Sequence, residues 1–334
     1  MARKKRTRTP FSLERLKKAE HTVMLFAVVF VLVFVGVSFL FGIDDILSKF
    51  ALLDPLMWVV LLALSLVNYV CRGMKWHIFG NRLKLGVPLK RMAVYYFGGM
   101  AMTVTPGKVG TALRLWFMNK GHNISYTKGL PLMIMDPITD LAALFIMCLA
   151  GLAAFGGGHT ASLLVFGAIL GGLMLLFAYP QLLLQLTKTI YLVFGRKKPR
   201  LYVRVMKIMR QLTQLVNFKT FMGTVGFSII GWLGSVFAFW WVLQQMGAEI
   251  TLLQAMFVFS FATILGGATM APGGLGGTEA SMVLSLLALG VDQDVAIAAT
   301  MVIRLTLLWF GVFIGFLFIP LGMKLVKQTQ PLTA

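Results

Sequence analysis

Long apolar runs separated by short basic stretches are the main pattern along the chain. Six runs are each about as long as the roughly 20 residues that a helix needs to cross some 30 Å of hydrocarbon. They lie at 22–42, 55–79, 129–155, 160–179, 221–246 and 295–322. Since only helices or closed barrels satisfy their backbone hydrogen bonds within lipid, this pattern predicts an all-α polytopic membrane protein with about six full spans.

Two further apolar segments, 92–118 and 251–290, are interrupted by Pro-Gly motifs. The motifs read Thr105-Pro106-Gly107-Lys108-Val109-Gly110 and, about half a chain later, Ala271-Pro272-Gly273-Gly274-Leu275-Gly276-Gly277-Thr278-Glu279. Proline removes a backbone donor and glycine permits positive φ. Opened backbone at membrane depth persists only where it is buried in protein or lines a cavity. We therefore expect two re-entrant helical hairpins, although the arms of the second are long enough to span.

The distribution of charge predicts the orientation in the membrane. The net charge is +20, and Lys and Arg concentrate on the cytoplasmic side of membrane proteins. The basic residues place the tail 1–21, the loop 181–219 and the tail 323–334 in the cytoplasm, with one membrane domain at 22–322 between the tails. The first hairpin then enters from the cytoplasm and the second from outside, which is the inverted arrangement of many transporter repeats.

Three residues near the end of the second run fit an interfacial position. Arg72, Lys75 and Trp76 stand close to the next basic stretch, and Trp and cations are typical of the membrane–water boundary. The sequence therefore predicts an interfacial belt formed by Trp76 and the cations of this region, which are Arg72, Lys75, Arg82, Lys84, Lys90 and Arg91.

The composition agrees with a membrane protein and excludes several other classes. Hydrophobic residues make up 58% of the chain, against roughly 45–50% in soluble domains. The positive charge is expected to face anionic lipid rather than nucleic acid. Cys71, Cys148 and the four histidines show no metal-ligand spacing, so no metal or other cofactor is expected. No Walker A motif is present, which argues against direct ATP hydrolysis.

Five charged residues fall within or beside the apolar segments. They are Arg114, Asp136, Asp140, Glu279 and Arg304. Ionisable groups at this depth are costly, face the bundle interior and usually pair. Asp136 and Asp140 are four residues apart and so share a helix face, which makes Arg114 a candidate partner for both. Arg304 is the natural partner of Glu279. Such pairs either hold broken helices together or take part in binding an anionic headgroup.

In the second interpretation, the cations and the exposed N–H groups of the two glycine-rich turns bind the headgroup. Lys108, at the first turn, is the best free cation for that role. Asp136 and Asp140 form the accompanying charge network. The expected substrate-binding set is Gly107, Lys108, Gly110, Arg114, Pro272, Gly273, Gly274, Gly276, Glu279 and Arg304.

The two Pro-Gly motifs, with Arg114, Asp140, Glu279 and Arg304, resemble the membrane region of lysylphosphatidylglycerol synthases. The resemblance extends from about Asn68 to Pro320. In the synthase branch this region is a lipid flippase that precedes a cytosolic aminoacyl-transferase domain. The chain ends shortly after its last span, so the resemblance implies the flippase part, in the cytoplasmic membrane of a prokaryote with both termini inside.

Several functions are compatible with these observations. The favoured one is a translocase that moves an anionic phospholipid or lipid-linked headgroup between leaflets, with membrane lipids as its partners. A membrane-embedded enzyme or an accessory subunit of a cell-envelope lipid synthase is an alternative, although no nucleophile accompanies the carboxylates. A proton-coupled small-solute transporter is another. A homo-oligomer is compatible with each, and the lipid and the direction of movement stay open.

Overall fold

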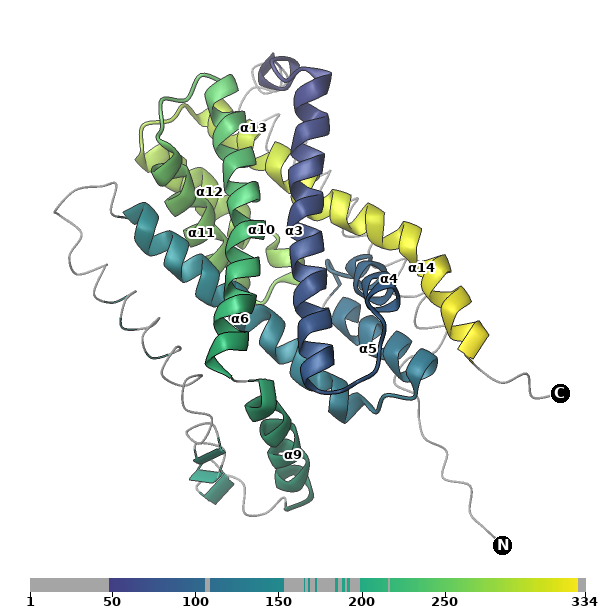
Figure 1. Cartoon of the computed structure of the whole chain (residues 1–334). Coiled ribbons are helices and arrows are strands. Elements are labelled where there is room, and N and C mark those ends of the chain that lie inside the picture. The colour runs from purple at the N-terminus through teal and green to yellow at the C-terminus, as the bar shows by residue number, and fades with distance from the viewer. Residues whose placement is uncertain are drawn as a thin grey trace, which may run out of the picture.

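The computed structural model describes residues 48–105, 109–152, 199–215 and 217–329, with a few isolated positions between 153 and 198 (Figure 1). The regular elements in this part of the chain are helical. In chain order they are α3 (Pro55–Arg82), α4 (Leu89–Met100), α5 (Val109–His122), α6 (Tyr126–Leu152), α9 (Pro199–Leu215), α10 (Phe218–Gln245), α11 (Leu252–Ala268), η5 (Pro272–Gly274), α12 (Gly277–Ala288), α13 (Gln293–Arg304), η6 (Leu305–Trp309) and α14 (Phe310–Thr329).

Four helical stretches of the described residues are long and apolar enough to cross a membrane. They are α3, α6, α10 and the continuous stretch 293–328 that joins α13, η6 and α14. Each corresponds to one predicted run and differs from it by a few residues at its ends. The other two predicted runs, 22–42 and 160–179, and the tail 1–21 lie outside the described residues, as do the last residues of the chain.

Local capping explains where three of the helices begin. The Asp54 carboxylate accepts a hydrogen bond from the Met57 amide at 2.6 Å, and Pro55 follows as the first residue of α3. Proline suits this position because its missing N–H has no intrahelical partner there. Asn217 caps α10, and Thr251 forms a reciprocal capping box with Gln254 at the start of α11. The side chain of an N-cap residue satisfies donors that the helix leaves free.

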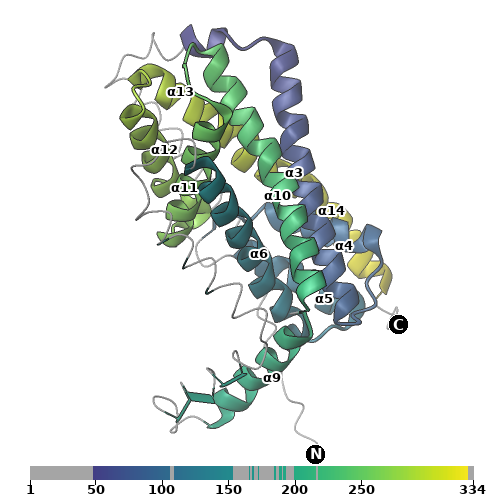
Figure 2. The same ribbon diagram turned by 60° about the vertical axis from the view of Figure 1, so that its left-hand side comes forward.

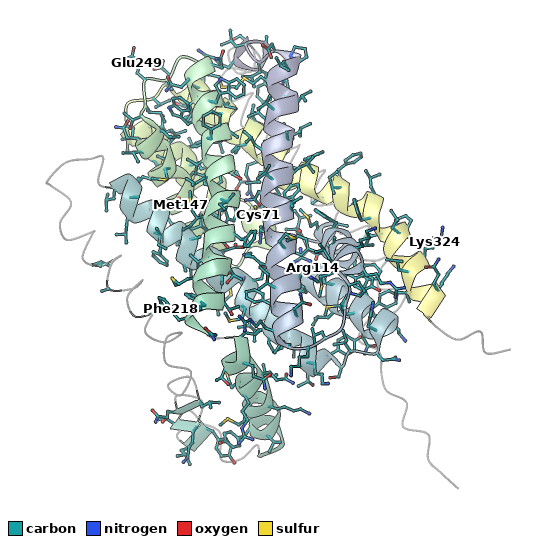
Figure 3. The ribbon with its side chains drawn as sticks, viewed as in Figure 1. Cys71, Arg114, Met147, Phe218, Glu249 and Lys324 are labelled. Atoms are coloured by element: carbon teal, nitrogen blue, oxygen red, sulfur yellow. The ribbon has the colours of Figure 1, made fainter. Side chains whose placement is uncertain are left out.

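Two helical hairpins approach the middle of the bundle from opposite ends. The helices α4 and α5 pack together near the end where α9 lies, while α11 and α12 pack near the end where α3 begins and Glu249 lies (Figures 1, 2 and 3). Their tips meet, because a Cβ added at Gly273 would lie 3.1 Å from Val104 Cγ1. The opposed geometry of the predicted hairpins 92–118 and 251–290 is therefore present. Their re-entry within a bilayer stays a prediction.

The second tip depends on glycine for its backbone. Gly273, Gly274 and Gly276 have φ values of 63°, 68° and 80°. Residues with a side chain rarely adopt this region, whereas glycine enters it readily. The chain thus turns sharply from η5 into α12 without strain, and this explains why apolar sequence contains so many glycines at this point.

A π-helical turn, η6, joins α13 to α14 immediately after Arg304. Such turns are rare and are frequent near functional sites. The hydroxyl of Tyr69, on α3, donates to the Leu307 carbonyl at 2.6 Å. The last long helical stretch is therefore fixed to α3 at the level where the two hairpin tips meet.

Cysteine labelling tests the opposed hairpins in the membrane. Ser125, between α5 and α6, and Asp292, before α13, are both exposed, whereas the native Cys71 and Cys148 are buried. We expect Ser125→Cys to react with a membrane-impermeant maleimide from the cytoplasmic side, and Asp292→Cys from the external side. Labelling of both variants from the same side would contradict the inverted arrangement.

Candidate functional site

A cluster of buried charges joins α3, α5, α6 and α10. At its centre is Lys75, whose side chain is fully buried. Its Nζ lies 2.5 Å from Asp140 Oδ1 and 3.1 Å from Asp136 Oδ1. The same ammonium donates to Ser228 Oγ at 2.8 Å and to Thr139 Oγ1 at 3.2 Å. A buried ammonium is tolerated because all of its protons point towards oxygen atoms.

Arg72 lies one helical turn before Lys75 and is the more exposed cation of the pair. Its Nη2 lies 2.9 Å from Asp140 Oδ2, and its guanidinium stands over the Trp232 ring at 5.5 Å. The side chain keeps 29% of its exposure, whereas that of Lys75 has none. Nε of Arg72 is buried and has no hydrogen-bond partner among the described residues. This cation therefore has donor capacity that its carboxylate partner does not use.

The third cation, Arg114, ties the first hairpin to this cluster. Its Nη1 lies 3.7 Å from Asp136 Oδ2, and its Nε donates to the Tyr96 carbonyl at 3.1 Å. The guanidinium also stands over the rings of Tyr96 and Trp76, at 3.9 and 5.0 Å from their centroids. Cation–π contacts strengthen when they are shielded from water. Figure 3 shows Arg114 in the interior beside α3, as expected for a residue that pairs with α6.

The helix α6 supplies both carboxylates of the cluster. Asp136 and Asp140 are four residues apart and point the same way, which confirms the prediction of a shared face. Pro137 lies between them within a continuous helix and lacks an N–H, so it leaves the carbonyl of Met133 without a helical donor. The cluster within the described residues combines three cations and two carboxylates, and so carries a net charge of +1.

A second ion pair holds the tip of the second hairpin. Arg304 Nε donates to Glu279 Oε1 at 2.6 Å, which confirms the predicted pairing. Its Nη2 also donates to the Gly273 carbonyl at 2.8 Å. Glu279 belongs to the first turn of α12, where the helix dipole favours a negative charge. One guanidinium thus connects α13, the glycine turn and α12.

The structure brings part of the predicted substrate-binding set together. Pro272, Gly273 and Gly274 form η5, and Gly276 is the residue before α12. This turn is adjacent to the Glu279–Arg304 pair. Gly110 lies in the first turn of α5. Gly107 and Lys108 are outside the described residues, so the role of Lys108 stays a prediction. Among the described residues, no ion pair links the Arg304 pair to the Arg114 cluster, although the two hairpin tips touch.

The predicted interfacial position is wrong for Lys75 and Trp76. Lys75 and Trp76 are fully buried, because α3 continues to Arg82 and its last turns pack inside the bundle. The signal that reveals this is the spacing of Ser65, Asn68, Arg72 and Lys75 on one face of an otherwise apolar helix. A polar stripe of this kind indicates a buried face with polar partners.

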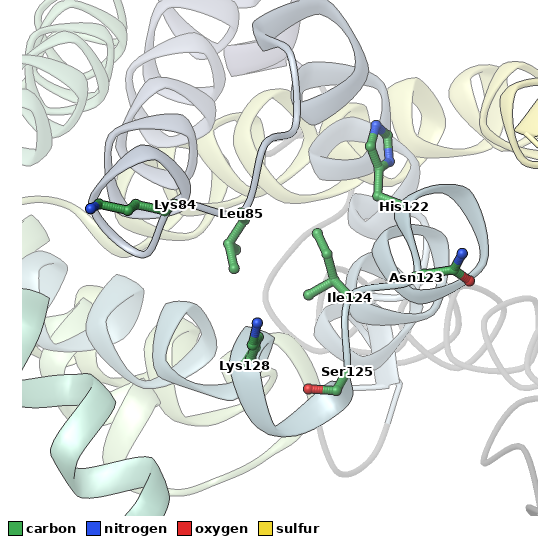
Figure 4. Close-up of a pocket in the computed structure, with 7 residues that line it drawn as sticks. All are labelled: Lys84, Leu85, His122, Asn123, Ile124, Ser125 and Lys128. Carbon is green, nitrogen blue, oxygen red and sulfur yellow. The ribbon is translucent and has the colours of Figure 1, made fainter.

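A shallow pocket of about 310 Å³ lies at the base of the first hairpin, apart from the charge cluster (Figure 4). Its lining residues are Lys84, Leu85, His122, Asn123, Ile124, Ser125 and Lys128. Burial of the His122 ring, followed by the nearby Arg91 cation, lowers the pKa of this histidine. The imidazole is therefore neutral at neutral pH, and the two lysines supply the positive charge of the pocket.

Comparison with known proteins places the chain among membrane proteins. The family model described as "Lysylphosphatidylglycerol synthase TM region" matches residues 24–315. A UPF0104 membrane protein of Pyrococcus horikoshii is 24% identical over 81% of this chain and 89% of its own length. A UPF0104 membrane protein of Methanothermobacter thermautotrophicus is 32% identical over 28% of each chain. Together with the four apolar helices, these matches identify a multi-pass membrane protein.

A double-mutant cycle tests the energy of the second ion pair. Glu279→Gln and Arg304→Gln should each lower the free energy of unfolding by about 1–3 kcal/mol, because the first leaves Arg304, whose side chain is 10% exposed, without its partner and the second leaves Glu279, 22% exposed, without its partner. The double variant should lose less than the sum, by at least about 0.5 kcal/mol. The matched control is the Lys49–Asp294 pair, 3.3 Å apart with both side chains 25% exposed. There we expect a coupling of at most about 1 kcal/mol; equal coupling for both pairs would contradict the assigned burial.

The two cations of α3 should differ in their importance for stability. Lys75→Met leaves two carboxylates around an apolar side chain, and we expect a loss of about 3–5 kcal/mol in the free energy of unfolding. Arg72→Met removes a partly exposed cation and leaves the cluster neutral, so its loss should be smaller. Thermal unfolding in detergent measures both. An equal loss would show that Lys75 is not the central charge.

Proposed function

Because this chain belongs to the family of the lysylphosphatidylglycerol synthase TM region, we propose that it is a lipid translocase that moves an anionic phospholipid or lipid-linked headgroup between leaflets. The observation that carries the proposal is the buried charge cluster with its excess positive charge. An unbalanced charge away from water is costly. An anionic headgroup beside Arg72 would offset that charge and accept a hydrogen bond from the guanidinium Nε, which has no partner among the described residues.

The chemistry of the cluster suits a phosphate-bearing headgroup. An arginine presents a planar fork of donors that matches phosphate oxygens, and such charge-assisted hydrogen bonds are strong. Arg72 retains both partial exposure and an unused Nε donor. Lys75 and Arg114, by contrast, are occupied with carboxylates or aromatic rings. Arg72 is therefore the contact that a headgroup reaches first, and the other two cations supply the field behind it.

The opposed hairpins support a transport role. Their tips meet near the Arg304 pair and the π-helical turn. We place six full spans and two inverted re-entrant hairpins in the membrane, with Lys108 and the glycine turns facing the headgroup. The two archaeal relatives are consistent with a cytoplasmic membrane of a prokaryote, and the basic loops with both termini inside.

A reconstituted lipid-movement assay tests this function. Purified protein in vesicles should accelerate the exchange of a fluorescent phosphatidylglycerol between leaflets. Arg72→Gln should slow this exchange about 10- to 100-fold, since the loss of one charge-assisted contact is worth about 1.5–3 kcal/mol. Arg72→Lys should retain part of the rate because it keeps the charge.

The same assay contains its own controls. Lys207→Gln removes an exposed cation of α9, outside the cluster, and should leave the rate unchanged. A neutral fluorescent glycolipid, which carries no phosphate, should be affected little by Arg72→Gln. If wild-type protein moved no lipid, or if Arg72→Gln moved the anionic lipid at the wild-type rate, the proposed headgroup site would be wrong.

A further inference from the structure

The interface between α3 and α10 contains a line of polar residues that runs away from the charge cluster. The two helices lie side by side over most of their length (Figures 1 and 2). On α3 the polar positions recur every three or four residues, which places them on one face, and α10 carries a similar face. We call this interface the α3–α10 seam, formed by Ser65, Asn68, Arg72 and Lys75 with Thr220, Thr224, Ser228, Gly231 and Ser235.

The seam is packed closely but is held by few hydrogen bonds between the helices. Ser65 donates to Leu61 O, and Thr224 to Thr220 O, so these hydroxyls are satisfied within their own helices. Among the described residues, the side-chain hydrogen bond that crosses between α3 and α10 is the one from Lys75 to Ser228. Separation of the two helices therefore breaks one such bond and leaves the hydroxyl bonds of Ser65 and Thr224 in place.

Three seam residues have buried polar atoms without a hydrogen-bond partner among the described residues, namely Arg72 at Nε, Thr220 at Oγ1 and Asn68 at both ends of its amide. The side chain of Asn68 is 1% exposed, and neither Nδ2 nor Oδ1 has a hydrogen-bond partner in the part of the chain that the structure describes. Buried polar groups are nearly always paired, because an unpaired one loses its hydration without compensation. An apolar residue at this position would pack without that cost. The amide therefore calls for a partner that it meets in another state of the protein.

We infer that α3 and α10 part during transport and that the headgroup passes along the seam, with Asn68 as its next contact after Arg72. The inference rests on the proposed function. Asn68 lies one turn from Arg72 towards the Asp54 end of α3, and the stretch from Lys75 to Ser65 covers about 15 Å at 1.5 Å per residue. That is about half of a hydrocarbon core of roughly 30 Å. The amide of Asn68 can donate to a phosphate oxygen and accept from a headgroup hydroxyl.

A disulfide between the helices tests whether they part. A Cβ added at Gly231 would lie 3.4 Å from the Cβ of the native Cys71, close to the roughly 3.5–4.5 Å found in disulfides. We therefore expect Gly231→Cys, in a Cys148→Ala background, to form a disulfide with Cys71 under mild oxidation. Mass spectrometry with thiol alkylation measures the fraction linked. The linked protein should lose at least nine-tenths of its phosphatidylglycerol exchange and regain it after reduction.

The matched control removes the partner thiol. Gly231→Cys with Cys71→Ala carries the same added side chain and cannot form the bond, so oxidation should leave its rate unchanged. If the fully linked protein moved lipid as fast as its reduced form, the seam would not open and the inference would be wrong.

Substitution of Asn68 provides a second test that does not depend on the disulfide. Asn68→Leu keeps the number and branching of the side-chain heavy atoms and removes the unpaired amide, so its thermal unfolding temperature should rise. If the amide contacts the headgroup, the rate for phosphatidylglycerol should nevertheless fall at least tenfold. A rise in unfolding temperature with an unchanged rate would reduce Asn68 to a packing residue and overturn the inference. Val67 lies on the same helix and is 43% exposed, so Val67→Leu should alter neither the unfolding temperature nor the rate.

The outcomes separate this inference from the proposed function. If the wild-type protein moves lipid while both the linked protein and Asn68→Leu retain its rate, translocation stands and the seam is not its path. If the wild-type protein moves no lipid, the translocase proposal fails and the path falls with it. Loss of transport in both variants, with folded protein retained, supports the seam.

Discussion

The buried charge of Lys75 is the constraint around which this structure is organised. An ammonium without water needs oxygen partners on several sides, and these come from α6 and α10, two helices far from α3 in sequence. The need for these contacts fixes how the three helices approach each other. Arg114 then adds the first hairpin to the same carboxylates. Three full-length helices and one hairpin are thus held by a single electrostatic centre in an otherwise apolar interior.

The two hairpins have different means of attachment to this frame. The first is fixed through the aromatic and ionic contacts of Arg114, whereas the tip of the second is held by Arg304 through a carboxylate and a backbone carbonyl. The first hairpin thus depends on Arg114 from its own helix α5, and the second on Arg304 from the neighbouring helix α13. Because the tips are in direct contact at Val104 and Gly273, movement of either hairpin changes the surroundings of the other. Under the proposed transport function, this contact would couple the opening of one side to the closing of the other.

The sequence was sufficient to predict the features that depend on local pattern. Run length predicted α3, α6 and α10, the Pro-Gly motifs predicted the hairpins, and the cost of lone charges predicted the Glu279–Arg304 pair. The position of Lys75 was not accessible in this way. Cations near the end of an apolar run are normally interfacial, and the carboxylates that draw this one inside follow about 60 residues later in the chain. Only the polar stripe on α3 records that contact locally.

The length of the last helical stretch has a mechanical consequence. The stretch has 36 residues, and its apolar part, 295–322, is about 42 Å long at 1.5 Å per residue, beyond a hydrocarbon core of roughly 30 Å. A helix with such a positive mismatch lies oblique to the membrane normal, and in Figure 1 α14 slants away from α3. The wedge opened by this slant houses the first hairpin, since α4 packs against both α14 and α3. Packing against neighbouring helices sets such a tilt, so we expect a change in bilayer thickness to strain the contacts between α14 and the first hairpin.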